Sequence, residues 1–144
     1  TSTALTKPIE VTGQMSATLW AATDARDTDW NVMLLDVFPD GHAERVQDGV
    51  ARARFRHGFD VGGEVPLTPG KVERYDLDLW FTSRVFEPGH RLRVSVSSAL
   101  FPKYDRNLNT GGNNERDSTF VVAHQRLVHD TAHPSHVVLP VIPR

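Results

Sequence analysis

The chain has 144 residues, a length typical of one domain and sufficient to bury a hydrophobic core. Sixteen lysines and arginines stand against 18 acidic residues, and this net charge of −2 argues against a nucleic-acid partner. The sequence contains no cysteine, which excludes a disulfide scaffold, a cysteine-ligated metal site and a cysteine nucleophile.

The sequence also predicts no contact with membranes. Its apolar runs are far shorter than the roughly 20 residues that a membrane span needs, and residues 1–8 lack the basic and apolar regions of a signal peptide. We therefore expect a soluble protein, with the cytoplasm favoured as its compartment. Because no initiator Met is present, we also expect a processed or excised piece of a longer chain.

Apolar and polar residues alternate along most of the chain. Residues 91–97 show the clearest case, and residues 75–81 and 51–56 repeat the pattern. A period of two predicts antiparallel strands with one face on the core and the other in water. The run from Trp30 to Phe38 is apolar on both faces and predicts an interior strand.

Turn sequences rich in Pro and Gly, such as residues 38–42 and 86–90, separate these runs. The predicted strands are 8–12, 15–23, 29–38, 42–55, 71–82, 90–98, 119–129 and 136–142. Such spacing predicts an all-β protein with two packed sheets of about four strands each, for which a jelly-roll β-sandwich is the natural topology. We predict a single domain over residues 1–144, without any helix longer than a turn.

The sequence shows no catalytic serine centre. A Ser-His-Asp triad needs an activated serine, but Ser16, Ser83 and Ser118 lie in or beside predicted strands without flanking glycines. No catalytic residue is therefore assigned.

Two clusters could hold a metal. Asp24, Asp27 and Asp29 could bind calcium, although they do not follow the EF-hand pattern; we favour side chains that bond nearby backbone N–H groups. A second cluster contains four histidines, namely His124, His129, His133 and His136. Residues 124 and 129 would point to opposite faces of a strand, so hydrogen-bonded histidines are favoured over zinc. No metal and no cofactor is predicted.

Two surface features have alternative interpretations. Arg52, Arg54 and Arg56 share one face of a predicted strand and could track phosphates, but ion pairs with Asp76 and Asp78 on another strand are the simpler account. Of the three tryptophans, Trp80 alone lies on the polar side of a clear alternation. It could stack on a sugar, although aromatic residues more often belong to cores or interfaces.

Several motifs, in order along the chain, resemble one family. They are residues 5–13 (LTKPIEVTG), 23–30 (TDARDTDW), 35–41 (LDVFPDG), 48–56 (DGVARARFR), 85–93 (VFEPGHRLR), 101–111 (FPKYDRNLNTG) and the closing stretch from 129 to 143. The chain is similar to the C-terminal domain of the X-Pro dipeptidyl-peptidase and cocaine-esterase family of α/β-hydrolases. The seven pieces cover nearly the whole chain, and the stretch 101–111 is the most diagnostic.

The resemblance implies a jelly-roll domain with a galactose-binding-like fold that follows a catalytic α/β-hydrolase domain. In that family the nucleophilic Ser, the Asp and the His lie upstream of the matched region, so this chain has no counterpart of them. The implied partner is the hydrolase domain of the same parent chain, whose substrate cleft the jelly roll can help to wall. An isolated domain that exposes its apolar contact surface is expected to self-associate.

The irregular segment 99–117 is the candidate contact region, because loops this long inside compact domains are usually functional or disordered. It contains aromatic and arginine types that are enriched at interfaces. Our hypothesis is that the loop faces the hydrolase domain or its substrate through Phe101, Tyr104, Asp105, Arg106, Asn107 and Asn109. The alternative is a loop held together by its own Asx turns. At the level of the whole chain, the alternative function is a free-standing carbohydrate- or ligand-binding module that uses Trp80.

Overall fold

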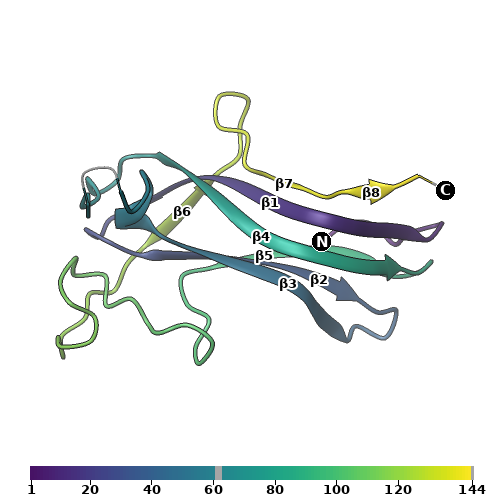
Figure 1. Cartoon of the computed structure of the whole chain (residues 1–144), viewed down its shortest axis with the longest axis horizontal. Coiled ribbons are helices and arrows are strands. Elements are labelled where there is room, and N and C mark those ends of the chain that lie inside the picture. Colours follow the sequence, from purple (N-terminus) through teal and green to yellow (C-terminus); the bar gives the residue numbers. More distant parts are fainter. Residues whose placement is uncertain (61–62, 144) are drawn as a thin grey trace.

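The protein is a β-sandwich of two antiparallel sheets in the computed structural model, which describes residues 1–60 and 63–143 (Figure 1). Within these residues the strands are β1 (Ile9–Thr23), β2 (Asp29–Val37), β3 (Ala43–Arg52), β4 (Glu73–Phe86), β5 (Arg91–Ser97), β6 (Gln125–Val128), β7 (His136–Val138) and β8 (Val141–Ile142). A single-turn 3-10 helix, η1 (Ala53–Phe55), follows β3. None of the described segments forms a helix long and apolar enough to cross a membrane.

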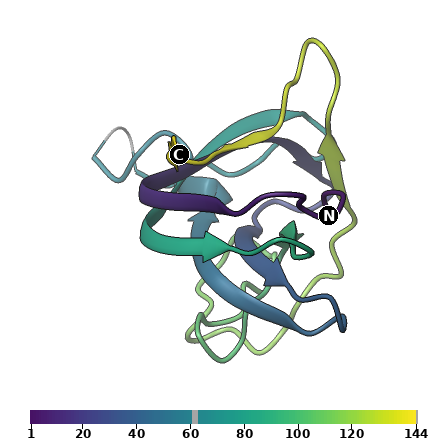
Figure 2. The same cartoon turned by 90° about the vertical axis from the view of Figure 1, so that its right-hand side faces the viewer.

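The long strand β1 organises the larger sheet. One of its edges pairs with β4, and its other edge pairs in turn with β8, β7 and β6. The smaller sheet has the order β3-β2-β5, and Figure 2 shows the sandwich from one end. The predicted all-β sandwich is confirmed, but the prediction of about four strands in each sheet is wrong, because the described sheets have five and three.

Several predicted strand boundaries are also wrong. The predicted strands 8–12 and 15–23 belong to one strand, β1, which pairs with β4 on both sides of a bulge between Gln14 and Ser16. The irregular backbone just before this bulge is accommodated by Gly13 (φ +136°). The predicted strand 42–55 ends in η1, and 136–142 divides into β7 and β8. Only 125–128 of the predicted strand 119–129 is extended in a sheet. Ahead of it, the backbone N–H of His124 bonds to the Asp24 carboxylate rather than to a neighbouring strand.

The inward residues of both sheets form one core. Trp30 of β2 and Tyr75 of β4 meet across it with their ring centroids 5.7 Å apart, and both side chains are buried. The predicted interior strand is confirmed, because β2 is the central strand of its sheet and is buried along most of its length. The sheets approach closely at Gly49 of β3, where a Cβ atom would collide with the carbonyl oxygen of Asp78.

One buried ion pair joins the two sheets. Asp36 on β2 is completely buried, and its Oδ2 accepts hydrogen bonds from Nη2 and Nε of Arg84 on β4 at 2.7 and 3.1 Å. Its Oδ1 lies 2.8 Å from Nδ1 of His90, whose ring packs on Phe38. An unpaired charge at this depth would be costly, so the pair fixes the position of β4 relative to β2.

Arg84→Ala should therefore lower the free energy of unfolding by about 3 kcal/mol, because it leaves a buried carboxylate without its main cation. Arg74→Ala is the matched control on the same strand: its pair with Asp76 is exposed on both sides and should contribute less than about 1 kcal/mol. Chemical denaturation of both variants measures the difference. Equal losses would contradict the structural role of the Asp36 pair.

Candidate functional site

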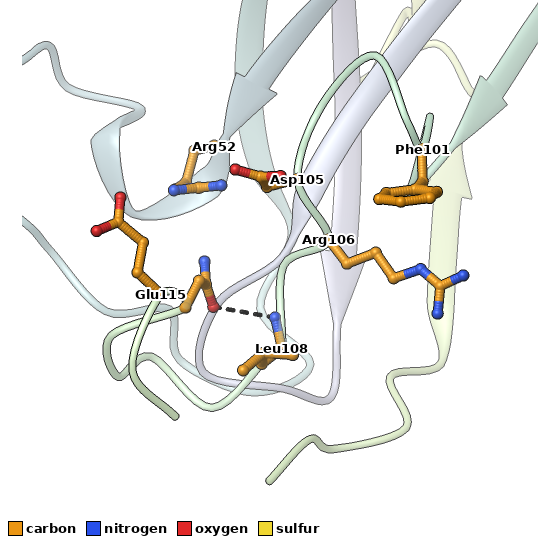
Figure 3. A pocket seen from close by; sticks show the side chains of 7 residues that line it. Arg52, Phe101, Asp105, Arg106, Leu108 and Glu115 are labelled. Carbon is orange, nitrogen blue, oxygen red and sulfur yellow. Dashed lines mark hydrogen bonds between the residues drawn. The ribbon is translucent and has the colours of Figure 1, made fainter. Parts of the chain in front are cut away.

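The loop 99–117 closes one end of the sandwich, at the lower left of Figure 1. Together with Arg52 at the end of β3, the loop lines a cavity of about 600 Å³ that is open to solvent (Figure 3). Three residues of the sequence-based hypothesis line this cavity, namely Phe101, Asp105 and Arg106. Leu108, Asn114 and Glu115 complete its wall.

The rim of the cavity combines an aromatic ring with charges of both signs. The Phe101 side chain is 62% exposed, and the Arg106 guanidinium lies 5.3 Å from its ring centroid, within the range of a cation–π contact. On the opposite wall, Asp105 lies beside Arg52 (Figure 3). The rim can therefore make both apolar and charged contacts with a binding partner.

The Arg52 side chain is already bound to a carboxylate of the neighbouring strand. It donates two hydrogen bonds to Asp29, at 3.0 and 3.2 Å, in a bidentate pair. These hydrogen bonds raise the pKa of Arg52 above its ordinary value, with smaller contributions from the charges of Asp27 and Asp105. Arg52 is therefore a fixed part of the wall, whereas the Arg106 side chain contacts the face of the Phe101 ring.

Asn107 and Asn109 lie behind the cavity and hold the loop. Asn107 Nδ2 donates to Asp27 Oδ2 at 2.9 Å and to Asp29 Oδ1 at 2.8 Å. Its Oδ1 accepts the backbone N–H of Asn109 at 2.9 Å, and Asn109 has a left-handed backbone (φ +62°). Asn109 in turn donates to the carbonyl of Val121. The contact between Asn107 and Asn109 is an Asx turn of the kind that the alternative interpretation describes. The contacts with Asp27, Asp29 and Val121 instead tie the loop to residues outside it.

A buried charge cluster supports this base. Arg54, on η1, is buried and places Nε 3.0 Å from Asp27 Oδ2, while its Nη1 donates to Glu64 and to the carbonyl of Gly112. Burial raises the pKa of Asp27, and the hydrogen bond from Asn107 and the charge of Arg54 oppose that rise. The cluster thus joins the β1–β2 connection, η1 and the long loop.

A second anchor holds the start of the loop. The buried Asp48 on β3 accepts hydrogen bonds from Lys103 Nζ, at 2.7 and 2.8 Å, and from the Tyr104 hydroxyl at 3.1 Å. The hydrogen bonds that Lys103 donates to Asp48 are the main cause that raises the pKa of Lys103 above its ordinary value. Tyr104 faces a neighbouring cavity of about 430 Å³ that Phe55 and Phe59 also line. Sequence reasoning missed Asp48, because nothing in its local pattern marks it as buried.

Trp80 lies apart from the loop and lines neither cavity. It sits at an irregularity of β4 with φ +62°, where its backbone N–H donates to Asp78 Oδ1 at 2.7 Å. Its side chain is 62% exposed, as the alternation predicted. The same alternation placed Phe81 on the core face, and this is wrong: Phe81 is 65% exposed, because the register shifts at this irregularity. The structure therefore separates Trp80 from the other six candidate residues.

Six members of the acidic and histidine clusters make hydrogen bonds or ion pairs: Asp24, Asp27, Asp29, His124, His133 and His136. Asp27 and Asp29 face arginines, and Asp24 Oδ2 lies 2.7 Å from Nδ1 of His124. Hydrogen bonds that Asp24 accepts from His124, above all from its backbone N–H, lower the pKa of Asp24. His133 pairs likewise with Asp130 at 3.1 Å. No group of three or more His, Asp or Glu side chains placed to hold a metal ion occurs among residues 1–60 and 63–143.

The predicted arginine stripe on a solvent-facing strand is wrong. The strand ends at Arg52, so Arg54 turns inward to Asp27, and Arg56 donates to the carbonyl of Val65 and lies 3.8 Å from Glu73. Ion pairing was the correct interpretation of the stripe. Its partners are Asp29, Asp27 and Glu73 rather than Asp76 and Asp78.

Comparisons with known proteins agree on one family. Residues 1–138 match the X-Pro dipeptidyl-peptidase C-terminal non-catalytic domain. The cocaine esterase of Rhodococcus sp. (strain MB1 Bresler) is 45% identical over 142 residues, which cover 97% of this chain and 24% of that protein.

Two solved structures are similar across almost the whole chain. An α-amino acid ester hydrolase superposes with a TM-score of 0.90 at 33% identity, covering 97% of this chain and 24% of that one. An aminopeptidase from a marine sediment archaeon (Thaumarchaeota archaeon) gives 0.87 at 33% identity, covering 99% and 25%.

The fold and the family match thus define a jelly-roll domain of a non-catalytic, C-terminal type. The chain belongs to the family of X-Pro dipeptidyl-peptidase C-terminal non-catalytic domains. It spans about a quarter of the length of the esterase that it matches.

Asn107→Ala should destabilise the fold by about 2 kcal/mol at pH 7, because it removes a hydrogen bond to a buried carboxylate. The variant should lose less at pH 4. Burial already raises the pKa of Asp27, so ionisation of Asp27 opposes folding as the pH rises from about 4. Removing the Asn107 amide raises that pKa further, and the difference from the unmodified protein should grow between pH 4 and pH 7.

Chemical denaturation at the two pH values tests this expectation. Asn113→Ala is the matched control, since Asn113 makes an exposed Asx contact to the N–H of Glu115 in the same loop. It should change stability little and equally at both pH values. A loss for Asn107→Ala that is the same at pH 4 and pH 7 would contradict the role of Asp27.

Proposed function

We propose that this chain is the C-terminal domain of a longer serine hydrolase of the dipeptidyl-peptidase or acyl-esterase type. In this proposal it packs on the α/β-hydrolase domain, and its loop 99–117 helps to shape the substrate cleft. The catalytic Ser, Asp and His would come from the rest of the protein. The names of the relatives support this class, since they include an esterase, an ester hydrolase and an aminopeptidase.

The observation that carries the proposal is a rigidly based loop with an exposed, interface-type rim. Buried carboxylates hold the loop from below through Asn107 and Lys103. Its outer side presents Phe101 and Arg106 around an open cavity. An isolated domain gains nothing from holding a large aromatic ring in water, but aromatic and arginine side chains at the centre of an interface carry much of its binding energy. The rim is therefore assigned to the contact with the hydrolase domain or its substrate.

The first measurement is the intact mass of the native gene product from its source cells, followed by labelling with a serine-reactive fluorophosphonate. We expect a mass well above 16.1 kDa, with the label on a serine outside residues 1–144. A native species near 16.1 kDa, or a label within these residues, would contradict the proposal.

Arg106→Ala in the full-length protein should lower kcat/KM for an ester substrate about tenfold, the equivalent of about 1.4 kcal/mol for one well-placed interface side chain. Arg116→Ala is the matched control, an exposed arginine of the same loop that does not line the cavity. It should leave turnover unchanged. If both variants match the unmodified enzyme in turnover and in melting temperature, the loop has no part in the cleft.

A second candidate function rests on Trp80. Together with Phe81 it forms an exposed aromatic pair on the larger sheet, away from the loop, and flat exposed rings can stack on sugars. A binding module would retain glycans on an array, lose them with Trp80→Ala, and keep them with Arg106→Ala. Glycan binding that survives Trp80→Ala would remove this candidate.

A further inference from the structure

The smaller sheet has an open edge at β5. β5 pairs with β2 on one side only, in the sheet order β3-β2-β5. Leu92, Val94 and Val96 alternate with polar residues, and Leu92 and Val96 pack against the core. Val94 lies between them on the same face, yet it is 42% exposed. An inward-facing valine in contact with water indicates that the sandwich is not covered at this edge.

The uncovered region is an apolar groove of about 350 Å³ between β5 and the β6–β7 edge of the larger sheet. Most of its lining is aliphatic: Leu19, Val94, Val96, Leu127, Val137 and Leu139. It therefore opens onto the core itself, whereas the loop cavity is lined largely by charged and amide side chains. Exposed apolar surface of this kind marks a contact site.

The first residues of the chain already occupy the start of this edge. The backbone N–H of Ser2 donates to the carbonyl of Leu92, and that of Leu5 to the carbonyl of His90, both at 2.8 Å. Arg93 Nε also donates to Thr1 Oγ1 at 2.8 Å. As the residue number rises along this segment, from Ser2 to Leu5, the number of its partner falls from Leu92 in β5 to His90 just before β5, so the pairing is antiparallel.

This pairing fixes the direction in which the edge continues. The Leu92 carbonyl and N–H both face the N-terminal segment. Since backbone groups alternate along a strand, those of Val94 and Val96 point to the same side. Within the described residues, no backbone hydrogen bond from another segment reaches them there. A chain running back from Thr1 in the same register would lie along these groups.

We propose that, in the full-length protein, the segment directly N-terminal to Thr1 forms an additional strand on β5 and fills the groove with its alternate side chains. With Ser2 opposite Leu92, the first residue before Thr1 lies opposite Val94 and the third opposite Val96. These two residues face the groove and are apolar, while the second residue before Thr1 lies opposite Ser95 on the outer face. The inference depends on the longer chain of the proposed function but not on the role of the loop 99–117.

The register can be tested by a cysteine pair in the full-length protein. Ser95→Cys is combined with a cysteine at the second residue before Thr1. These positions would form a non-hydrogen-bonded antiparallel pair, in which side chains lie close together, and the described chain contributes no competing cysteine. We expect a disulfide in most molecules after mild oxidation, identified by mass spectrometry of the proteolytic peptides. The control combines the same upstream cysteine with Ser83→Cys, an exposed strand position on the other sheet, and should not cross-link.

Hydrogen exchange of the unmodified full-length protein supplies a second measurement that needs no substitution. The amides of Val94 and Val96 should exchange as slowly as those of Arg93 and Ser95, which face β2. Fast exchange at Val94 and Val96, with no cross-link, would overturn the proposal. Slow exchange without the cross-link would assign the groove to another part of the protein. A cross-link between two molecules would assign it to a second copy, and either result overturns the proposal as stated.

The same samples keep this inference separate from the proposed function. Labelling by the fluorophosphonate reports whether the longer chain is a serine hydrolase, whatever happens at β5. A labelled enzyme without the cross-link refutes only the additional strand. A cross-linked but unlabelled protein refutes only the hydrolase assignment.

Discussion

The candidate site depends on the buried carboxylate of Asp27. Its burial raises its pKa, an unfavourable state that the amide of Asn107 and the charge of Arg54 offset. Arg54 comes from η1 and Asn107 from the long loop, so one group fixes three segments that are distant in the sequence. Together with the anchor of Lys103 and Tyr104 on Asp48, this contact holds a loop rich in Asn and Gly that carries Phe101 and Arg106.

The same arrangement recurs at two other buried aspartates. Asp36 binds Arg84 across the two sheets, and Asp48 binds Lys103 at the start of the loop. Apolar contacts between sheets are non-directional, so on their own they tolerate small shifts of one layer over the other. A buried carboxylate is strongly destabilising unless its cation is in place. Such pairs therefore select one position of the two layers, although each intact pair adds little to the net free energy of folding.

The sequence predicts the strands that alternate, and fails where a polar residue has a distant partner. Residues 91–97 and 75–81 form β5 and part of β4 because one face of each meets the core. The alternation through Arg54 looked the same, but its partner Asp27 lies 27 residues away and turns the chain into η1. In the loop, length and composition indicated a candidate segment. Length and composition do not show that Asn107 bonds to buried carboxylates while Arg106 lines the cavity. Both residue types occur in buried hydrogen bonds and at exposed surfaces.

The two exposed regions of this domain differ in chemistry, and this difference suits them to different kinds of contact. The loop cavity and the β5 groove share no lining residue. The groove is aliphatic and continuous with the core, so an extended segment with alternating apolar side chains matches it and would complete the smaller sheet. The loop rim carries charges of both signs around one aromatic ring, so it matches a folded surface with its own polar groups. Self-association of an isolated domain would therefore begin at β5, where apolar surface and unpaired backbone groups coincide, and would leave the loop free.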